Sequence, residues 1–516
     1  MCPPTFFLPN LSPPRFVKQK KHRSIANRML SLFAGLLFFT LNLSAQNSFD
    51  ALRYSNFQVG GTARSIGAGG ALGALGADFS VLSTNPAGLG WYRKGEFVLS
   101  PTFYNARTAS TLINSKDELA TKENRNNFNV NALGVVVASR PTSPNWTTFN
   151  FGIGINRLAN FHQKFVYEGV SEGSIVLAHQ EQANGPDGIS DFESGLSIDA
   201  QALYDLEPQD GIYESDFDLA PDAPIFRRQE FISRGSINEL VFSFAGNYKE
   251  RILLGATIGV PFLRYEEDKT YWEEDQGAGP DGDVPLFDDL EYTEELNTTG
   301  VGINLKVGMI VRVHPALRLG VAVHTPTAFK LEDAFRSSMA YNFTYPDGEI
   351  VNGFAESPDG LFNYRLRTPW RVIGSGGFII KKMGFLSAEV EYVNYGNNEF
   401  RYDGFIDAER DVNNSIANEF EPALNIRLGA EAAYEIFRFR AGLGIQQSPF
   451  ANDDTTNKTY SAGFGIREQN FSFDFAYQLR QNEEIFIPYQ ASDSPEQAVL
   501  NEGNFNKFAF TVGFRF

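Results

Sequence analysis

The sequence predicts an all-β protein: an antiparallel transmembrane β-barrel of about 14 strands with an N-terminal hatch inside its lumen. Three observations predict this fold. From residue 97 onward, apolar residues alternate with small or polar residues over segments of about ten residues, as in strands with a lipid face and a lumen face. Short and long connections alternate between these segments. A glycine-dense stretch at residues 57–91 precedes them and suits neither a helix nor a strand.

Residues 1–45 are predicted to be a signal peptide. Basic residues precede an apolar run at residues 30–41, and Leu43-Ser44-Ala45 supplies a small-residue cleavage pattern. The apolar run is shorter than the about 20 residues that a membrane-spanning helix needs. The single cysteine, Cys2, lies in this segment, so the exported chain is expected to lack disulfide bonds. No later segment is apolar enough for a spanning helix, so a membrane location requires a closed barrel.

Residues 46–94 are predicted to form the hatch. Their small side chains allow tight packing against an enclosing wall. Asn85, Pro86, Ala87 and Gly88 predict a turn, because proline presets φ and asparagine bends the chain before it. A nucleotide-binding loop is rejected, because the glycine spacing is one residue too wide and no βαβ unit follows.

Residues 95–516 are predicted to form the barrel. Its expected strand cores are residues 97–106, 127–139, 146–157, 237–248, 252–265, 299–313, 317–331, 369–380, 384–395, 423–434, 437–447, 459–467, 471–481 and 506–516. Short connections follow every second strand, at residues 141–145, 249–251, 314–316, 381–383, 435–436 and 468–470. Short periplasmic turns that alternate with long extracellular loops are typical of a barrel whose two ends both lie in the periplasm.

The two largest extracellular loops are expected at residues 170–235 and 267–298, and both are acidic. Asp281 and Asp283 suggest a calcium site, but the spaced oxygen ligands and distal glutamate of a calcium-binding loop are missing. Solvated turns are the simpler interpretation. With 44 basic and 62 acidic residues the formal net charge is −18, which argues against a nucleic-acid partner, whose phosphates require basic residues.

No catalytic motif stands out. The chain has five histidines, and it contains no His-Glu-x-x-His motif, no Gly-x-Ser-x-Gly motif and no paired cysteines. No enzyme activity, cofactor or metal is therefore expected. The alternative is an outer-membrane hydrolase assembled from loops around His162 or His179.

Basic residues on the inward phase of the strands are the candidate ligand-binding residues. They are Lys306, Arg318, Arg371, Arg427 and Arg440, with Arg438 on the same phase. Two explanations stay open. The cations could pair with Glu389, Glu391, Glu431 and Asp474 in a polar lumen network. Alternatively, one or two of them could hold the carboxylate of an amphipathic ligand whose tail lies among apolar side chains.

Several short motifs follow one another along the chain after the predicted signal peptide. They are Asn85-Pro-Ala-Gly-Leu89, Gly300-Val-Gly-Ile-Asn-Leu-Lys-Val-Gly308, Leu317-Arg-Leu-Gly320, Thr325-Pro326, Thr368-Pro-Trp-Arg371, Asn425-Ile-Arg-Leu-Gly-Ala-Glu431, Arg440-Ala-Gly442, Ser448-Pro449 and Phe475-Ala-Tyr477. In these motifs and their order, the chain resembles the FadL/TodX family of outer-membrane transport proteins.

The resemblance implies a 14-stranded barrel with an N-terminal hatch, to whose motif Asn85, Pro86 and Ala87 correspond. It also implies passive uptake of long-chain fatty acids or other apolar molecules through an extracellular capture site, a rearrangement of the hatch and an opening in the wall. Gly152 and Gly154 in the third strand are the candidates for that opening, because glycine marks bends in strands.

The expected partners are a hydrophobic small-molecule ligand, the lipids of the outer membrane of a Gram-negative-type bacterium, and the barrel assembly machinery through the C-terminal strand ending at Phe516. A monomer is expected, because a closed barrel has no free strand edge. Two other functions stay open. One is a structural or adhesive barrel that acts through its acidic loops. The other is a hydrophilic porin, against which the hatch argues.

Overall fold

One antiparallel sheet closes on itself, because its first strand, β1 (Glu96–Leu112), is hydrogen-bonded to its last strand, β19 (Val499–Arg515). The computed structural model describes residues 47–58, 60–116, 118–186, 188–207, 211–277, 282–453, 455–492 and 494–516. The predicted signal peptide and Asp281 therefore lie outside the described residues. The other strands are β2 (Thr121–Ser139), β3 (Trp146–Asn160), β4 (Gln163–Glu172), β5 (Pro224–Tyr248), β6 (Ile252–Glu274), β7 (Phe287–His314), β8 (Leu317–His324), β9 (Ala328–Thr344), β10 (Ile350–Glu356), β11 (Gly360–Arg367), β12 (Arg371–Ile380), β13 (Gly384–Asn394), β14 (Glu399–Tyr402), β15 (Pro422–Tyr434), β16 (Phe437–Gln447), β17 (Thr456–Arg467) and β18 (Phe471–Phe486).

These segments make 14 wall strands, because several of them continue one another across short breaks. The interrupted strands are β3 with β4, β8 with β9, β10 with β11 and β12, and β13 with β14. Each expected strand core falls on one of the 14, although several of the strands extend well beyond their expected cores. The predicted 14-stranded antiparallel barrel is confirmed.

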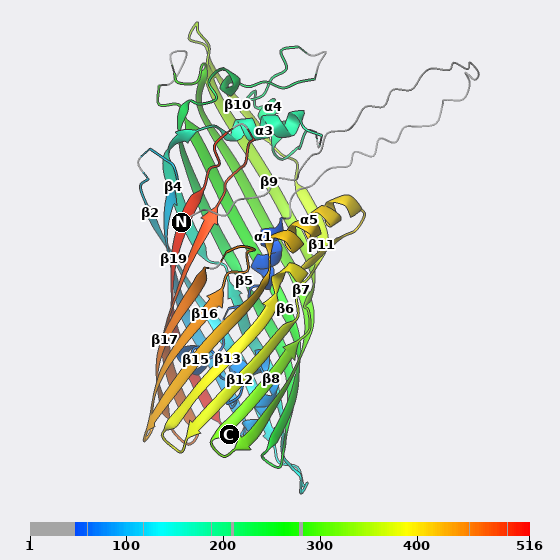
Figure 1. Cartoon of the computed structure of the whole chain (residues 1–516), viewed down its shortest axis with the longest axis vertical. Coiled ribbons are helices and arrows are strands. Elements are labelled where there is room, and N and C mark those ends of the chain that lie inside the picture. The colour runs from blue at the N-terminus through cyan, green and yellow to red at the C-terminus, as the bar shows by residue number, and fades with distance from the viewer. Residues whose placement is uncertain are drawn as a thin grey trace, which may run out of the picture. The chain divides into compact units, whose positions relative to one another are not determined.

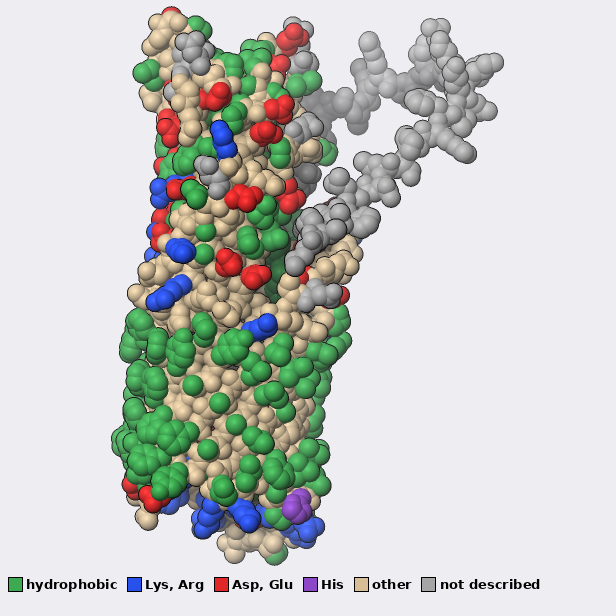
Figure 2. Space-filling view, turned by 60° about the vertical axis from the view of Figure 1, so that its left-hand side comes forward, with side chains coloured by type: hydrophobic (Ala, Val, Ile, Leu, Met, Phe, Trp, Pro, Cys, Tyr) green, Lys and Arg blue, Asp and Glu red, His purple; other side chains and the backbone are tan. Residues whose placement is uncertain are grey.

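Alternation along each strand gives the wall an apolar outer face. In β7, Ile303 is 58% exposed, whereas its neighbour Asn304 points inward and is buried. Figure 2 shows the result as a broad belt of hydrophobic side chains around the lower part of the barrel. Such a belt suits the hydrocarbon core of a bilayer, so the outer-membrane barrel is confirmed in its fold and in its lipid-facing surface.

Several strands extend far above this belt. β5, β6 and β7 contain 25, 23 and 28 residues, about twice the roughly 9–11 residues that cross a bilayer. Figure 1 shows them rising toward α3 (Ile175–Asn184) and α4 (Ser194–Asp199), which cover the extracellular end. The prediction of loops at residues 170–235 and 267–298 is therefore wrong in part, because residues 224–235, 267–274 and 287–298 are strand.

The wall is lower along β15, β16 and β17, which contain 13, 11 and 12 residues. In Figure 1 these strands end well below β9 and β10. The helix α5 (Ile406–Glu419) connects β14 to β15 and contacts α1. The ring of Phe420, which follows it, packs against Phe450 at a centroid distance of 5.4 Å. Among the described residues, no helix is long and apolar enough to cross a membrane.

Residues 47–92, which we call the N-terminal segment, lie inside the barrel. They form α1 (Ser48–Ser55), α2 (Ala63–Gly67), η1 (Phe79–Ser83) and η2 (Pro86–Trp91). The side chains of Asn47, Thr62, Asp78 and Asn85 cap these short helices by accepting a backbone N–H bond. Most side chains between residues 61 and 90 are buried, so the segment fills the lower lumen.

Glycine lets this segment approach the wall closely. Gly69 has a φ of +64°, and a Cβ added there would lie 2.8 Å from the carbonyl oxygen of Leu428 in β15. It would also lie 3.2 Å from the Cα of Gly442 in β16. A side chain at this position would therefore combine a strained backbone with a backbone clash.

Candidate functional site

Residues 85–88 form the predicted turn and begin η2. The Asn85 side chain accepts a hydrogen bond from the backbone N–H of Ala87 (3.2 Å) and donates one to the carbonyl of Gly73 (2.8 Å). Gly308 of β7 makes room for it, since a Cβ added there would lie 2.0 Å from Asn85 Oδ1. The turn is confirmed, while a gating role for it stays a prediction.

Two of the predicted lumen cations share a pair of carboxylates on β13. Arg427 of β15 binds Glu389 at 2.7 Å and Glu391 at 2.8 Å, and Arg371 of β12 binds Glu391 at 2.9 Å. Glu389 also accepts the backbone N–H of Gly73 at 3.1 Å. This network therefore ties the N-terminal segment to the wall.

Lys306 and Arg440 are buried and paired as well. Lys306 donates to Glu239 of β5, an acid that the sequence analysis did not single out. Arg440 binds Glu431 and Asp474, each at 2.7 Å. The polar lumen network expected from the sequence is therefore present around these cations.

Arg318 and Arg438 bond to backbone carbonyls instead. Arg318 donates to the carbonyl of Leu75 at 2.8 Å, and its guanidinium lies 3.9 Å from the centroid of the Trp91 ring. Arg438 donates to the carbonyls of Glu435 and Phe437 at the β15–β16 turn. Arg318 thus holds the N-terminal segment, and Arg438 holds a periplasmic turn.

The histidines of the hydrolase alternative have neutral side chains as hydrogen-bond partners. His162 contacts the side chains of Asn127 and Asn160, each at 2.9 Å, and buried His179 contacts Ser197 at 2.6 Å. No carboxylate is hydrogen-bonded to either ring in the described part of the chain. No group of three His, Cys, Asp or Glu within that part is arranged to hold a metal ion.

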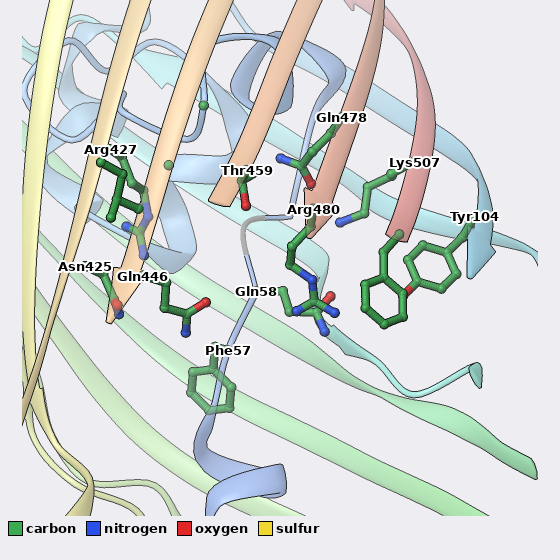
Figure 3. Close-up of a pocket in the computed structure, with 14 residues that line it drawn as sticks. Phe57, Gln58, Tyr104, Asn425, Arg427, Gln446, Thr459, Gln478, Arg480 and Lys507 are labelled. Carbon is green, nitrogen blue, oxygen red and sulfur yellow. The ribbon is translucent and has the colours of Figure 1, made fainter. Parts of the chain in front are cut away.

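A cavity of about 50 Å³ lies between the N-terminal segment and strands β15 to β19 and β1. Its lining combines rings of Phe57, Tyr104 and Phe505 with the cations Arg480 and Lys507, which project into the same space in Figure 3. We call it the upper cavity. The described side chains that line it include no carboxylate. The upper cavity is thus amphipathic and cationic.

Arg480 and Lys507 were missed by the sequence analysis. Arg480 stacks over the Phe505 ring, with 4.6 Å between the guanidinium carbon and the ring centroid, and that ring stacks on Tyr104 at 6.1 Å. Both cations follow the inward phase of their strands, two residues from the inward Gln478 and Ala509 respectively. The alternation alone could therefore have identified them.

A second cavity, of about 70 Å³, shares Phe57, Gln58 and Arg427 with the first. We call it the inner cavity. Its lining includes Lys306 and Arg371 from the lumen network and Arg157 from β3. The stretch at Phe57 and Gln58 therefore borders both spaces.

Gly152 and Gly154 do not lie at an opening, because both are paired on each side, with β2 and with β5. The ladder between β2 and β3 ends at Ala132 and Asn156. Above this point β2 pairs with β1 and β4 pairs with β5, which leaves a seam without a backbone ladder between β2 and the upper part of β3 and β4. Side chains bridge this seam, Asn127 with His162 at 2.9 Å and Glu123 with Lys164 at 3.8 Å. Phe128, 71% exposed, stands on β2 beside the seam. An opening to lipid stays a prediction, and the seam is a better place for it.

The N-terminal segment covers the seam from inside. The backbone N–H of Gln58 donates to the carbonyl of Leu158 at 2.8 Å. A Cβ added to Gly60 would lie 2.3 Å from the carbonyl oxygen of Arg157. Gln58 and Gly60 therefore lie directly against β3 where its pairing with β2 has ended.

No protein-family model matches this chain, and no curated protein sequence matches it. Solved structures are similar over most of its length. A FadL homologue from Pseudomonas aeruginosa has 13% sequence identity and a TM-score of 0.53, and the match covers 89% of this chain and 99% of that chain. The toluene transporter TodX of Pseudomonas putida has 10% identity and a TM-score of 0.50, with coverages of 90% and 100%. The predicted resemblance is thus confirmed for the fold.

Proposed function

We propose that the chain is an outer-membrane channel for the passive uptake of hydrophobic small molecules, such as long-chain fatty acids. One observation carries the proposal: two cavities meet at Phe57 and Gln58, at the place where the wall has an unpaired seam. The likeness of the fold to a FadL homologue and to a toluene transporter supports it.

Capture takes place in the upper cavity. Phe57, Tyr104 and Phe505 offer an apolar surface to a hydrocarbon chain, while Arg480 and Lys507 attract a carboxylate. Entry is from above β15 to β17, where the wall is lowest (Figure 1). An apolar solute needs such a route, because it crosses a water-filled pore only at a high free-energy cost.

Release requires the N-terminal segment to move. When the stretch from Phe57 to Gly60 leaves β3, the hydrogen bond from Gln58 to Leu158 breaks and the two cavities join. The ligand then passes through the seam into the membrane, beside Phe128. The process is driven by the concentration gradient of the ligand alone.

The test is uptake of a labelled long-chain fatty acid by cells with and without the gene, with a small sugar as the control solute. Loss of fatty-acid entry alone supports the proposal, and unchanged entry excludes this ligand. Toluene is tested in parallel as an apolar solute without a carboxylate.

Head-group recognition is tested by Arg480→Gln with Lys507→Gln. Because a hydrogen bond to a charged group contributes about 1.5–3 kcal/mol, fatty-acid uptake should fall about ten-fold or more, while toluene uptake stays unchanged. Arg336→Gln is the matched control, since Arg336 is exposed and pairs with Asp359 far from the cavity. An equal loss for both solutes would contradict a carboxylate-binding role.

A structural or adhesive barrel is the second candidate. Leu206 and Leu219 in the connections around the covering helices are exposed, as a binding surface would be. Deleting residues 47–92 separates the two functions. A transporter loses controlled uptake, whereas an adhesive protein keeps the binding that its extracellular part provides.

A further inference from the structure

A group of basic residues occupies the periplasmic end of the barrel. It consists of Lys94, Arg140, Lys249, Arg251, Lys381 and Lys382, all exposed, and we call it the basal cluster. Glu250, the acidic residue of the β5–β6 turn, forms ion pairs with Arg93 and Arg312, which do not belong to the cluster. Figure 2 shows basic side chains gathered below the apolar belt, with a few acidic ones at its lower left edge. Both kinds are present above the belt, where acidic side chains are prominent. The basal cluster is therefore opposite in sign to the chain as a whole, whose net charge is −18.

The β5–β6 turn places two of these cations against apolar side chains. Lys249 and Arg251 stand between Tyr248 and Ile252, and the Lys249 ammonium lies 5.4 Å from the centroid of the Tyr248 ring. That ring packs edge-on against Trp146 at 5.4 Å. Aromatic rings of this kind mark the interface between lipid and water.

The β12–β13 turn repeats the arrangement. Lys381 and Lys382 stand between Ile380 and Met383, and Met383 is 65% exposed. Both turns are short, so their cations cannot extend far from the belt. They lie at the depth of the lipid headgroups.

We propose that the basal cluster binds the anionic headgroups of phospholipids in the periplasmic leaflet. The β2–β3 and β5–β6 turns lie side by side, since the backbone N–H of Lys249 donates to the carbonyl of Asn145 at 2.8 Å, whereas the β12–β13 turn lies several strands away in the sheet. A surrounding layer of lipids reaches both places. A small acidic protein docked on one side of the barrel would not reach both places. Attraction to an anionic lipid surface is favourable for each Lys or Arg close to it and is screened by salt.

The experiment measures which lipid lies next to Trp146. The full chain with Trp91, Trp272 and Trp370 replaced by Phe is reconstituted in phosphatidylcholine vesicles. Quenching of Trp146 by brominated phosphatidylglycerol is then compared with quenching by brominated phosphatidylcholine at the same fraction. A second variant, which keeps only the exposed Trp370 at the upper edge of the belt, reports on the lipids of the extracellular side.

The expected result is stronger quenching of Trp146 by the anionic lipid. Lys249→Gln with Arg251→Gln should reduce this excess about two-fold or more, as should high salt, without changing the Trp370 signal. Arg336→Gln with Arg410→Gln, on the extracellular side, is the charge-matched control and should leave the excess unchanged. Equal quenching by the two lipids, or an excess that survives the Lys249 and Arg251 substitutions, overturns the proposal. Heat-dependent gel migration verifies that each variant is folded.

Discussion

Gly60→Ala should accelerate uptake of the hydrophobic ligand. The added Cβ would lie 2.3 Å from the carbonyl oxygen of Arg157, a distance that real contacts do not reach. This oxygen belongs to the backbone of β3, so it cannot rotate away as a side chain would. The N-terminal segment must therefore move off the strand, which weakens the 2.8 Å hydrogen bond from Gln58 to Leu158.

The size of the effect follows from that hydrogen bond. A hydrogen bond of this kind contributes about 0.5–1.5 kcal/mol net. Losing about 1 kcal/mol raises the population of the displaced segment about five-fold. If displacement limits the flux, the initial rate of fatty-acid uptake should rise by a similar factor.

The assay compares initial uptake rates in cells with equal amounts of surface protein. Gly374→Ala is the matched control, because a Cβ added at Gly374 in β12 meets nothing within 4 Å. It should leave the rate unchanged. An unchanged or lower rate for Gly60→Ala would refute the argument that this contact holds the path closed.

Two further predictions concern stability. Glu389→Ala removes a partner of buried Arg427 and should lower the free energy of unfolding in urea by about 3–5 kcal/mol. Asp407→Ala breaks an exposed ion pair on α5 and should change this free energy by less than about 1 kcal/mol. Similar losses for the two variants would contradict the anchoring role of the network. Burial lowers the pKa of His179 in α3 to about 4, so the unfolded chain protonates this histidine more readily than the folded chain does. The helices α3 and α4 should therefore lose stability as the pH falls from about 6.5 to about 4. Limited proteolysis across this pH range measures the loss, and an identical pH profile for His179→Gln would contradict the assignment.

The strands could be predicted because the lipid imposes a local pattern. Inside the belt every second side chain must be apolar, as in β7 at Val301, Ile303 and Leu305. Above the belt the same strand faces water, so outward residues such as Glu291 are charged. Because the apolar alternation is missing there, residues 287–298 were predicted to be loop. Strand pairing continues there although the apolar signal has ended.

The candidate site was predictable only in part. The inward phase identified lumen cations, but which of them meets a carboxylate depends on the register between strands, as in the contact of Lys306 with Glu239. The seam likewise depends on where the β2–β3 ladder stops, at Asn156, and no local motif encodes that. Gly152 and Gly154 were predicted to mark the opening because glycine marks bends in strands, yet their ladders are continuous on both sides.

In the proposed mechanism, the N-terminal segment must leave β3 before a ligand passes. A disulfide between Gln58→Cys and Leu158→Cys tests it, because these residues are hydrogen-bonded neighbours and the only other cysteine is Cys2. The oxidised protein should take up no fatty acid, a reductant should restore uptake, and each single cysteine variant should transport normally. Uptake by the fully oxidised protein at the rate of the reduced one would contradict this mechanism.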